Sequence, residues 1–249
     1  MFFNLFSKNK DEFIKVYAEK LAQAALDEEL DGETLEELIR YAKDKDLSNK
    51  QLAGAQGFAC DKAFEELYQE GYLDDEDYEV FASLIDACYM MKPEQKYRYE
   101  TIAKRSNAIY KIQEKGLLPK IKKDYANVKY RDGENLHFVA SAKLMKPVDS
   151  ATEAEVIIDR NHPFLAGSLT DVANGAWKEE TPGAFFITTE RIGFRGKNAS
   201  FTMELADLER AELGKGPLRL YEKGKEEVVA VKIDDYEMAG VLLSRLLKC

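Results

Sequence analysis

Residues capable of catalysis or metal binding are few in this sequence, and none stands at a spacing that defines a site. The histidines are His137 and His162, and the cysteines are Cys60, Cys88 and Cys249. Zinc sites use motifs such as HExxH or cysteine pairs, and both are absent, as are GxSxG, a P-loop and a strand-linked GxGxxG. We therefore expect a non-catalytic protein without a cofactor, a metal centre or a small-molecule substrate.

Four consecutive acidic residues, Asp74 to Asp77, form the densest group of carboxylates. Such a group could bind Ca²⁺, but an EF-hand loop requires Asp-x-Asp-x-Asp-Gly and a closing Glu, and this order is absent. Carboxylates in the first turn of a helix are stabilised by the helix dipole. We therefore interpret Asp74 as an N-cap and the residues after it as a helix start.

Charge is distributed unevenly along the 249 residues, whose net charge is −10. Residues 1–91 carry −13, residues 92–128 carry +6 and residues 129–249 carry −3. Nucleic-acid binding derives its affinity from Lys and Arg contacts to phosphate, so the acidic total argues against a nucleic-acid partner. The basic segment either docks on the acidic residues beside it or binds phosphate groups of lipid or RNA. Its candidates for partner or anion contact are Lys96, Arg98, Lys104, Arg105, Lys120, Lys122 and Lys123.

An aromatic N-terminal segment is a candidate for membrane contact. Phe2, Phe3 and Phe6 precede Lys8 and Lys10, so the rings could enter a bilayer surface while the lysines contact anionic headgroups. Alternatively, the rings pack onto the helices that follow. The segment is too short for a signal peptide or a membrane span, and the odd cysteine count fits a reducing compartment. We expect a cytoplasmic protein, either free or peripheral at the inner face of the membrane.

Helical patterns dominate residues 1–128. Apolar residues recur there at three- and four-residue steps, and Ser48 and Gln51 form a capping box. We predict an acidic helical bundle whose last helix, within about 93–128, is basic.

Two segments of this half share the pattern Leu-Asp-x-Glu-x-apolar-Glu-x-apolar, at residues 30–38 and 73–81. The pattern indicates either a duplicated helical hairpin or two helices that begin by the same capping rule. With its acidic helices and the Asp31-Gly32-Glu33 step, the stretch of roughly residues 10–91 resembles the bacterial tellurite-resistance B-like domains. That resemblance implies a small bundle whose acidic face could hold a cation.

Strand patterns dominate residues 129–249, and they are clearest over Gly183–Leu213. Turn-forming Gly196-Lys197-Asn198 separates two runs of apolar and β-branched residues, and we predict three strands in this stretch. Before it, we predict a strand at residues 155–158 and a turn at Thr181-Pro182-Gly183. An amphipathic helix is predicted to end the chain.

The segment GAFFITTERIGFRG resembles the signature of the bacterial PH-like and GRAM domains. Gly183, Thr188, Arg191 and Phe194 stand at matching positions, and Asp207 occupies the apolar-x-Asp-apolar step that usually follows. The resemblance implies a bacterial source and a bent sheet closed by a helix. It also implies a scaffold that binds lipid headgroups, peptides or copies of itself. Relatives that bind phosphoinositides place several basic residues between their first two strands, where this chain offers Lys143 and Lys146.

These patterns predict an α+β protein with two domains. Residues 1–128 are expected to form an all-α helical bundle, and residues 129–249 a PH-like β-barrel or sandwich closed by a C-terminal α-helix. We expect a binding or adaptor protein that recognises a protein partner or self-assembles through the PH-like domain. Trp177 is a candidate contact residue, although packing on the barrel would also explain it. Peripheral attachment to anionic membranes is the first alternative, and an enzyme of unknown reaction is the second.

Overall fold

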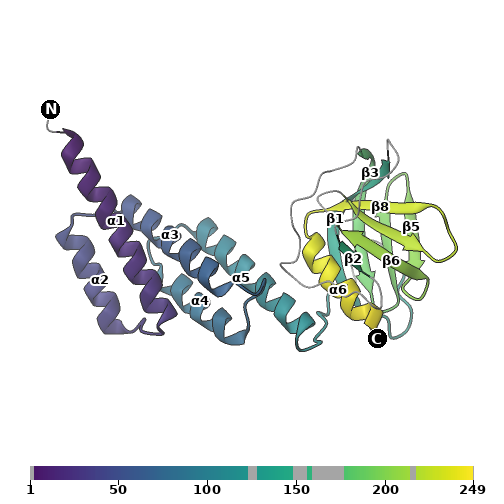
Figure 1. Ribbon diagram of the computed structural model, residues 1–249, viewed down its shortest axis with the longest axis horizontal. Coiled ribbons are helices and arrows are strands. Elements are labelled where there is room, and N and C mark those ends of the chain that lie inside the picture. The colour runs from purple at the N-terminus through teal and green to yellow at the C-terminus, as the bar shows by residue number, and fades with distance from the viewer. Residues whose placement is uncertain (1–2, 123–127, 148–155, 159–176, 214–216, 249) are drawn as a thin grey trace. The chain divides into compact units, whose positions relative to one another are not determined.

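The computed structural model describes residues 3–122, 128–147, 156–158, 177–213 and 217–248. The side chains of residues 3–9, 147, 156 and 157 lie outside this description. The described residues form six helices and eight strands, with five helices before the first strand (Figure 1). This arrangement confirms the α+β class. The chain divides into two compact units, Met1–Tyr110 and Lys111–Cys249.

The first unit is a helical bundle. Its helices are α1 (Phe3–Leu26), α2 (Gly32–Asp44), α3 (Asn49–Leu67), α4 (Asp75–Ala87) and α5 (Pro93–Gln113), the last of which continues into the second unit. The predicted capping box is present, because the Ser48 side chain accepts from the Gln51 N–H and the Gln51 side chain accepts from the Ser48 N–H. Asp74 is the N-cap of α4 and accepts from the Asp77 N–H at 2.8 Å. These caps satisfy N–H groups that have no partner inside their helices.

The bundle core combines large apolar side chains with small ones. Tyr17, Phe81 and Leu84 are almost fully buried, and small residues on α3 bring the neighbouring helices close to it. Cys60 and Cys88 are also fully buried, with their Sγ atoms 3.7 Å apart, as expected for cysteines that serve as small core residues.

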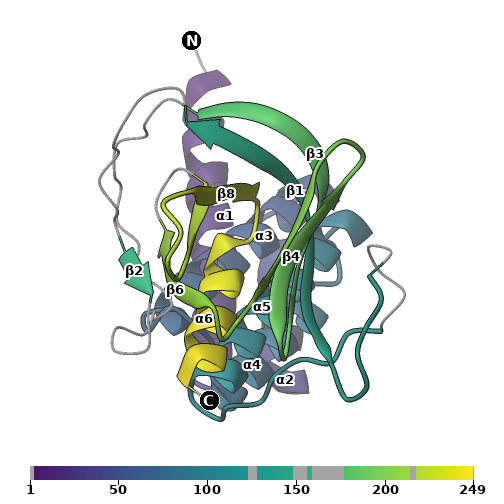
Figure 2. The ribbon, with the colours of Figure 1, turned by 90° about the vertical axis from the view of Figure 1, so that its right-hand side faces the viewer.

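The second unit is one antiparallel sheet with a helix. Its elements are β1 (Leu136–Pro147), β2 (Val156–Ile158), β3 (Trp177–Thr188), β4 (Arg191–Gly196), β5 (Ser200–Glu204), β6 (Leu208–Leu213), β7 (Leu218–Glu222), β8 (Val228–Ile233) and α6 (Tyr236–Lys248). The strand order is β2-β6-β7-β8-β1-β3-β4-β5. Figure 2 shows the sheet curling around α6. The two edge strands in this order are β2 and β5.

Aromatic residues fill one face of the sheet. Phe185 pairs across the sheet with Phe194, and Phe194 pairs with Phe201. Phe185 and Phe194 are fully buried. The α6 helix contacts β1, β2 and β3, and Leu242 and Leu243 on it are fully buried. This face and α6 therefore enclose the core of the unit.

The structure corrects two strand predictions. Residues 183–213 contain four strands rather than three, because a turn separates β5 from β6, with the Asp207 N–H bonded to the Glu204 carbonyl at 3.0 Å. The turn predicted at Thr181-Pro182-Gly183 is wrong, since these residues lie inside β3. β4 ends opposite Gly183, so the β3 residues that precede Gly183, Pro182 among them, have no partner on β4. A proline without an N–H is tolerated at such a position.

Candidate functional site

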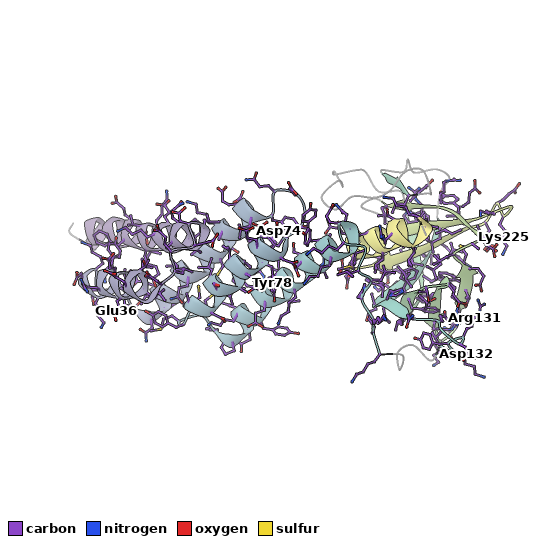
Figure 3. All side chains as sticks on the ribbon, turned by 90° about the horizontal axis from the view of Figure 1, so that it is seen from below. Glu36, Asp74, Tyr78, Arg131, Asp132 and Lys225 are labelled. Atoms are coloured by element: carbon purple, nitrogen blue, oxygen red, sulfur yellow. The ribbon has the colours of Figure 1, made fainter. Side chains whose placement is uncertain are left out.

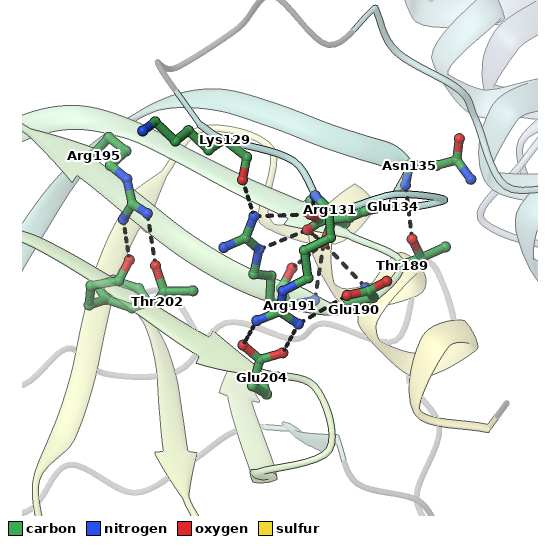
Figure 4. A network of polar contacts seen from close by, with 12 residues as sticks. Lys129, Arg131, Glu134, Asn135, Thr189, Glu190, Arg191, Arg195, Thr202 and Glu204 are labelled. Carbon is green, nitrogen blue, oxygen red and sulfur yellow. Dashed lines mark hydrogen bonds and ion pairs between the residues drawn. The ribbon is translucent and has the colours of Figure 1, made fainter.

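A buried ion pair joins the β3–β4 turn to the segment that precedes β1. Glu134 is fully buried, and its carboxylate accepts hydrogen bonds from Arg191 Nε at 2.8 Å and Arg191 Nη2 at 2.9 Å (Figure 4). The Thr188 hydroxyl donates to the same carboxylate at 2.6 Å. Thr188 Oγ1 also accepts from the Arg191 N–H at 3.0 Å, which closes the turn. Thr188 and Arg191 of the predicted motif therefore act together, and Glu134 is their common partner.

The protonation of Glu134 reflects these contacts. Burial by itself would raise the pKa of this carboxyl. The hydrogen bonds from Arg191, from Thr188 and from the Arg131 N–H outweigh burial and lower its pKa to about 2. The group is therefore a charged structural partner rather than a proton donor at neutral pH.

A second arginine extends the network to the surface. Arg131 Nη2 donates to Glu204 at 2.6 Å, and its Nη1 donates to Glu190 at 3.0 Å. Glu190 lies in the β3–β4 turn and Glu204 ends β5, so Arg131 links two places on the sheet (Figure 4). The pKa of Arg131 is raised by its hydrogen bonds to Glu204 and Glu190. Figure 3 shows Arg131 and Asp132 on the surface of this unit.

Arg131 and Glu134 belong to a segment, the strap, that comprises residues 117–122 and 128–135. Ile121 and Val128 of the strap pack against Phe186 on β3, which is fully buried. The Ile121 N–H bonds to the Leu136 carbonyl at 2.9 Å. The strap therefore covers an apolar patch on the face of the sheet opposite the core.

His137 anchors the strap from β1. It lies at an irregularity of the β1–β3 register, between Leu136 and Phe138. Its Nδ1 lies 2.6 Å from the Pro119 carbonyl oxygen, so Nδ1 carries the proton and donates. Its Nε2 is buried without a hydrogen-bond partner among the described residues. These contacts give His137 a structural role, while His162 lies outside the described residues.

A second buried polar cluster lies on β6 and β7. Glu212 accepts from Tyr221 Oη at 2.7 Å and forms ion pairs with Arg210 at 3.1 Å and Arg219 at 3.3 Å. The Arg210 guanidinium lies 3.8 Å from the centre of the Tyr221 ring, close enough for a cation–π contact. Burial and the bond to Glu212 raise the pKa of Tyr221. This cluster cross-links the two strands.

Several of the predicted basic contact residues interact within their own unit. Lys96 Nζ donates to the Asp86 carbonyl at 3.4 Å, and Lys104 pairs with Glu100 at 3.4 Å. The Arg98 guanidinium lies 5.8 Å from the centre of the Tyr99 ring. Arg105 is half-buried on α5, Lys120 and Lys122 are exposed, and Lys123 lies outside the described residues.

Most side chains of the aromatic N-terminal segment lie outside the part of the chain that the structure describes. Phe2 lies outside the described residues, as do the side chains of Phe3, Phe6 and Lys8 in the first turns of α1. Lys10 donates to the Asp46 carbonyl oxygen at 3.0 Å and pairs with its carboxylate at 3.1 Å.

The remaining motif residues have structural positions. Trp177 is half-buried at the start of β3, opposite Pro147. Gly183 leaves room for the Phe194 ring, because a Cβ atom there would come within 2.5 Å of Phe194 Cζ. Asp207 is exposed in the β5–β6 turn, and its carbonyl accepts from the Lys223 N–H at 2.8 Å.

A cleft of about 530 Å³ lies between α1 and α2, and residues of α4 and of the α1–α2 connection line another of about 430 Å³. Both clefts lie at described residues of the bundle. The lining of the larger cleft mixes both charges and includes Lys20, Asp27, Glu37, Arg40 and Tyr41. Within the described ranges, no group of three His, Cys, Asp or Glu side chains could hold a metal ion. The helices of the described chain include none that is both long and apolar enough to cross a membrane.

Sequence patterns missed Glu134, Arg131 and Glu212. The side chains that bind Glu134, those of Thr188 and Arg191, are more than fifty residues away in the sequence. No spacing rule connects such residues, so only the fold brings them together. A scan against protein-family models gives no match, and a search of curated proteins finds no similar sequence.

Proposed function

We propose that the second unit is a PH-like binding module and that the protein is a non-catalytic adaptor that recognises other proteins. The strand order supports a PH-like unit. With β2 set aside, the sheet runs β5-β4-β3-β1-β8-β7-β6 and the chain ends in a helix that packs on it. The motif residues also have roles that suit such a sheet, since Thr188 and Arg191 hold the β3–β4 turn.

Charge pairing favours a protein ligand over an anionic lipid, and this observation carries the proposal. Lys143 pairs with Glu179 at 2.7 Å, and Lys146 pairs with Glu180 at 2.8 Å. These are the two lysines at which a phosphoinositide would be expected to bind. The connection that follows them, residues 148–176, has five acidic residues and one basic residue. Two paired lysines followed in the sequence by a net negative segment disfavour the binding of anionic headgroups.

Flotation with vesicles of phosphatidylglycerol and phosphatidylcholine tests this choice. We expect the full chain to remain unbound at physiological ionic strength. The double variant Glu179→Gln/Glu180→Gln serves as the matched comparison, because it releases both lysines and should float more at low salt. Salt-sensitive flotation of the wild type that needs residues 1–10 would replace adaptor function with membrane attachment.

Sedimentation velocity over a wide concentration range tests recognition directly. Concentration-dependent self-association would support assembly through this module. If the chain stays monomeric, crosslinking in cells followed by mass spectrometry should identify a partner crosslinked to residues 111–249. Crosslinks confined to residues 1–110 would contradict the proposal, because the bundle would then be the recognition unit.

A further inference from the structure

The position of β2 in the sheet does not follow its position in the chain. β2 comes from the connection between β1 and β3, yet it does not pair with either of these strands in the sheet. It pairs with β6 at the far edge of the sheet, antiparallel, with Val156 opposite Leu213 and Ile158 opposite Ala211 (Figure 2). The seven other strands form a continuous sheet without it, so β2 is an addition to an already complete edge.

β2 lies between a strand and a helix, because it contacts α6 as well as β6. The position that it fills, with the β6 backbone on one side and α6 on the other, is called the groove below. Ile158 is fully buried there, and it stands opposite Ala211, which is also fully buried. The small alanine leaves space for the larger isoleucine, and Leu213 on the same strand is buried as well.

β2 is a short occupant of this edge. It has three residues, and so short a strand forms only a few ladder hydrogen bonds. Residues 148–155 and 159–176 separate it from β1 and β3 in the sequence. Elements with few bonds and little buried surface open at a low free-energy cost compared with global unfolding. When β2 leaves, β6 presents unpaired N–H and C=O groups, which are a template for another strand.

We propose that the groove between β6 and α6 binds an extended apolar segment of a protein partner, and that β2 is the chain's own occupant, which the partner displaces. This inference rests on the proposed adaptor function and names the site and the ligand class. The ligand adds as an antiparallel strand to β6, so main-chain hydrogen bonds supply affinity and buried alternate side chains supply specificity. The chain's own segment, Glu-Val-Ile-Ile-Asp at residues 155–159, indicates the preferred ligand: a short aliphatic run flanked by acidic residues.

Because β2 occupies the groove, it lowers the apparent affinity of the groove for a partner's segment. A tethered segment competes at a high effective concentration, on the order of millimolar. An external segment therefore binds the wild-type chain with an affinity reduced by the fraction of molecules whose groove is empty. Weakening β2 should increase binding without any new contact.

The test uses the full chain and a fluorescein-labelled peptide with the sequence of residues 153–160. The variant Ile158→Asp cannot bury its side chain opposite Ala211, so its groove should be empty. We expect it to bind the peptide at least about tenfold more tightly than the wild type. Ile158→Val is the matched control and should behave like the wild type. A peptide with aspartate at the position of Ile158 should bind neither protein. Equal binding of both peptides, or a folded Ile158→Asp chain that binds no better than the wild type, would overturn the proposal.

Hydrogen exchange on the wild type keeps the inference testable even if Ile158→Asp does not fold. A saturating concentration of unlabelled peptide should speed exchange at residues 156–158, while residues 211–213 remain protected by the incoming strand. Unchanged exchange at both segments would contradict displacement. Concentration-dependent wild-type dimers that form through exchanged β2 segments would make a second copy the occupant and overturn the proposal of a different partner.

The outcomes separate this inference from the adaptor function on which it rests. If a crosslinked partner binds residues 111–249 and saturating peptide does not compete, the groove is not its site, and only the inference fails. If the peptide binds as expected but flotation shows attachment to anionic membranes, the inferred peptide site is supported and the proposed adaptor function is contradicted.

Discussion

At the scale of single residues, the Glu134–Arg191 pair is a buried ion pair whose loss should destabilise the second unit. The Glu134 side chain is fully buried and that of Arg191 is 11% exposed, so removing one charge leaves the other without its partner in a medium of low polarity. Such losses cost roughly 3–5 kcal/mol. We expect Glu134→Gln to lower the free energy of unfolding by about 3 kcal/mol at pH 7, measured by urea denaturation. Glu209→Gln is the control. Glu209 is exposed, and its ion pair with Arg210 is long, at 3.7 Å. Its loss should therefore change the free energy of unfolding by less than about 0.5 kcal/mol.

The pH dependence of this difference follows from the lowered pKa. The Glu134 carboxyl has a pKa of about 2 in the folded protein against 4.5 for an ordinary glutamate. Its charged form therefore stabilises the fold above about pH 4.5, and the contribution is lost as the pH falls toward about 2. The stability gap between wild type and Glu134→Gln should be full at pH 7 and narrow through this range. A gap that stays constant down to pH 2.5 would show that shape, not charge, explains the effect.

Two glycines should respond in opposite directions to the same substitution. A Cβ atom on Gly193 would lie 2.5 Å from Phe186 Cζ and 2.9 Å from the Phe201 carbonyl oxygen, so Gly193→Ala must displace a buried ring or the backbone. We expect a loss of about 1–3 kcal/mol. Gly54 lies within α3 and has open space around the same position, so Gly54→Ala should stabilise the bundle by about 0.5–1 kcal/mol. Thermal unfolding of both variants checks the two signs.

The residue scale also shows where sequence information stops. Thr188 and Arg191 are identifiable because they lie in one short motif with fixed spacing, and Ser48 and Gln51 because a capping box is local. Glu134 is not identifiable, since its role arises when β1 brings the strap to the β3–β4 turn. Interactions within four residues leave a pattern in the sequence, whereas long-range ion pairs depend on the completed sheet.

At the scale of elements, the strap is part of the sheet unit and not a linker. It buries Phe186 and carries both Arg131 and Glu134. We expect the fragment 111–249 to fold with a cooperative thermal transition and fixed near-ultraviolet circular dichroism. The fragment 136–249 lacks the strap, exposes Phe186 and loses the Glu134 ion pair, so it should aggregate or bind hydrophobic dye. Equal cooperativity of the two fragments would show that the strap contributes little to the fold.

Element prediction succeeded where periodicity and caps coincide and failed where tertiary pairing decides. The helix starts at Asn49 and Asp75 follow their caps, and the strand predicted at residues 155–158 agrees with β2. The start of β3 at Trp177 was missed, because charged residues and Pro182 conceal a strand that is exposed over its first half. Pairing with β1 stabilises that half, and no local propensity reports it.

At the scale of the whole molecule, each unit has a core of its own, and we expect two unfolding events. The bundle core includes Leu84, which is fully buried, and the sheet unit encloses its aromatic face with α6. Leu84→Ala should lower the stability of the bundle by about 2–5 kcal/mol and leave the sheet unit unchanged. Glu134→Gln should lower the stability of the sheet unit and leave that of the bundle unchanged.

Calorimetry of the full chain and of both variants decides between independent and coupled units. Two resolved components, each displaced by only one of the substitutions, would establish independent folding, because energetic effects at sites without shared partners add. A single transition that both variants shift equally would instead show that the units unfold together. Far-ultraviolet circular dichroism assigns the components, since loss of the bundle removes most of the helical signal while loss of the sheet unit does not. If the units are independent, a protein that displaces β2 would act on the sheet unit without unfolding the bundle. Independent folding of this kind is what the proposed adaptor function requires.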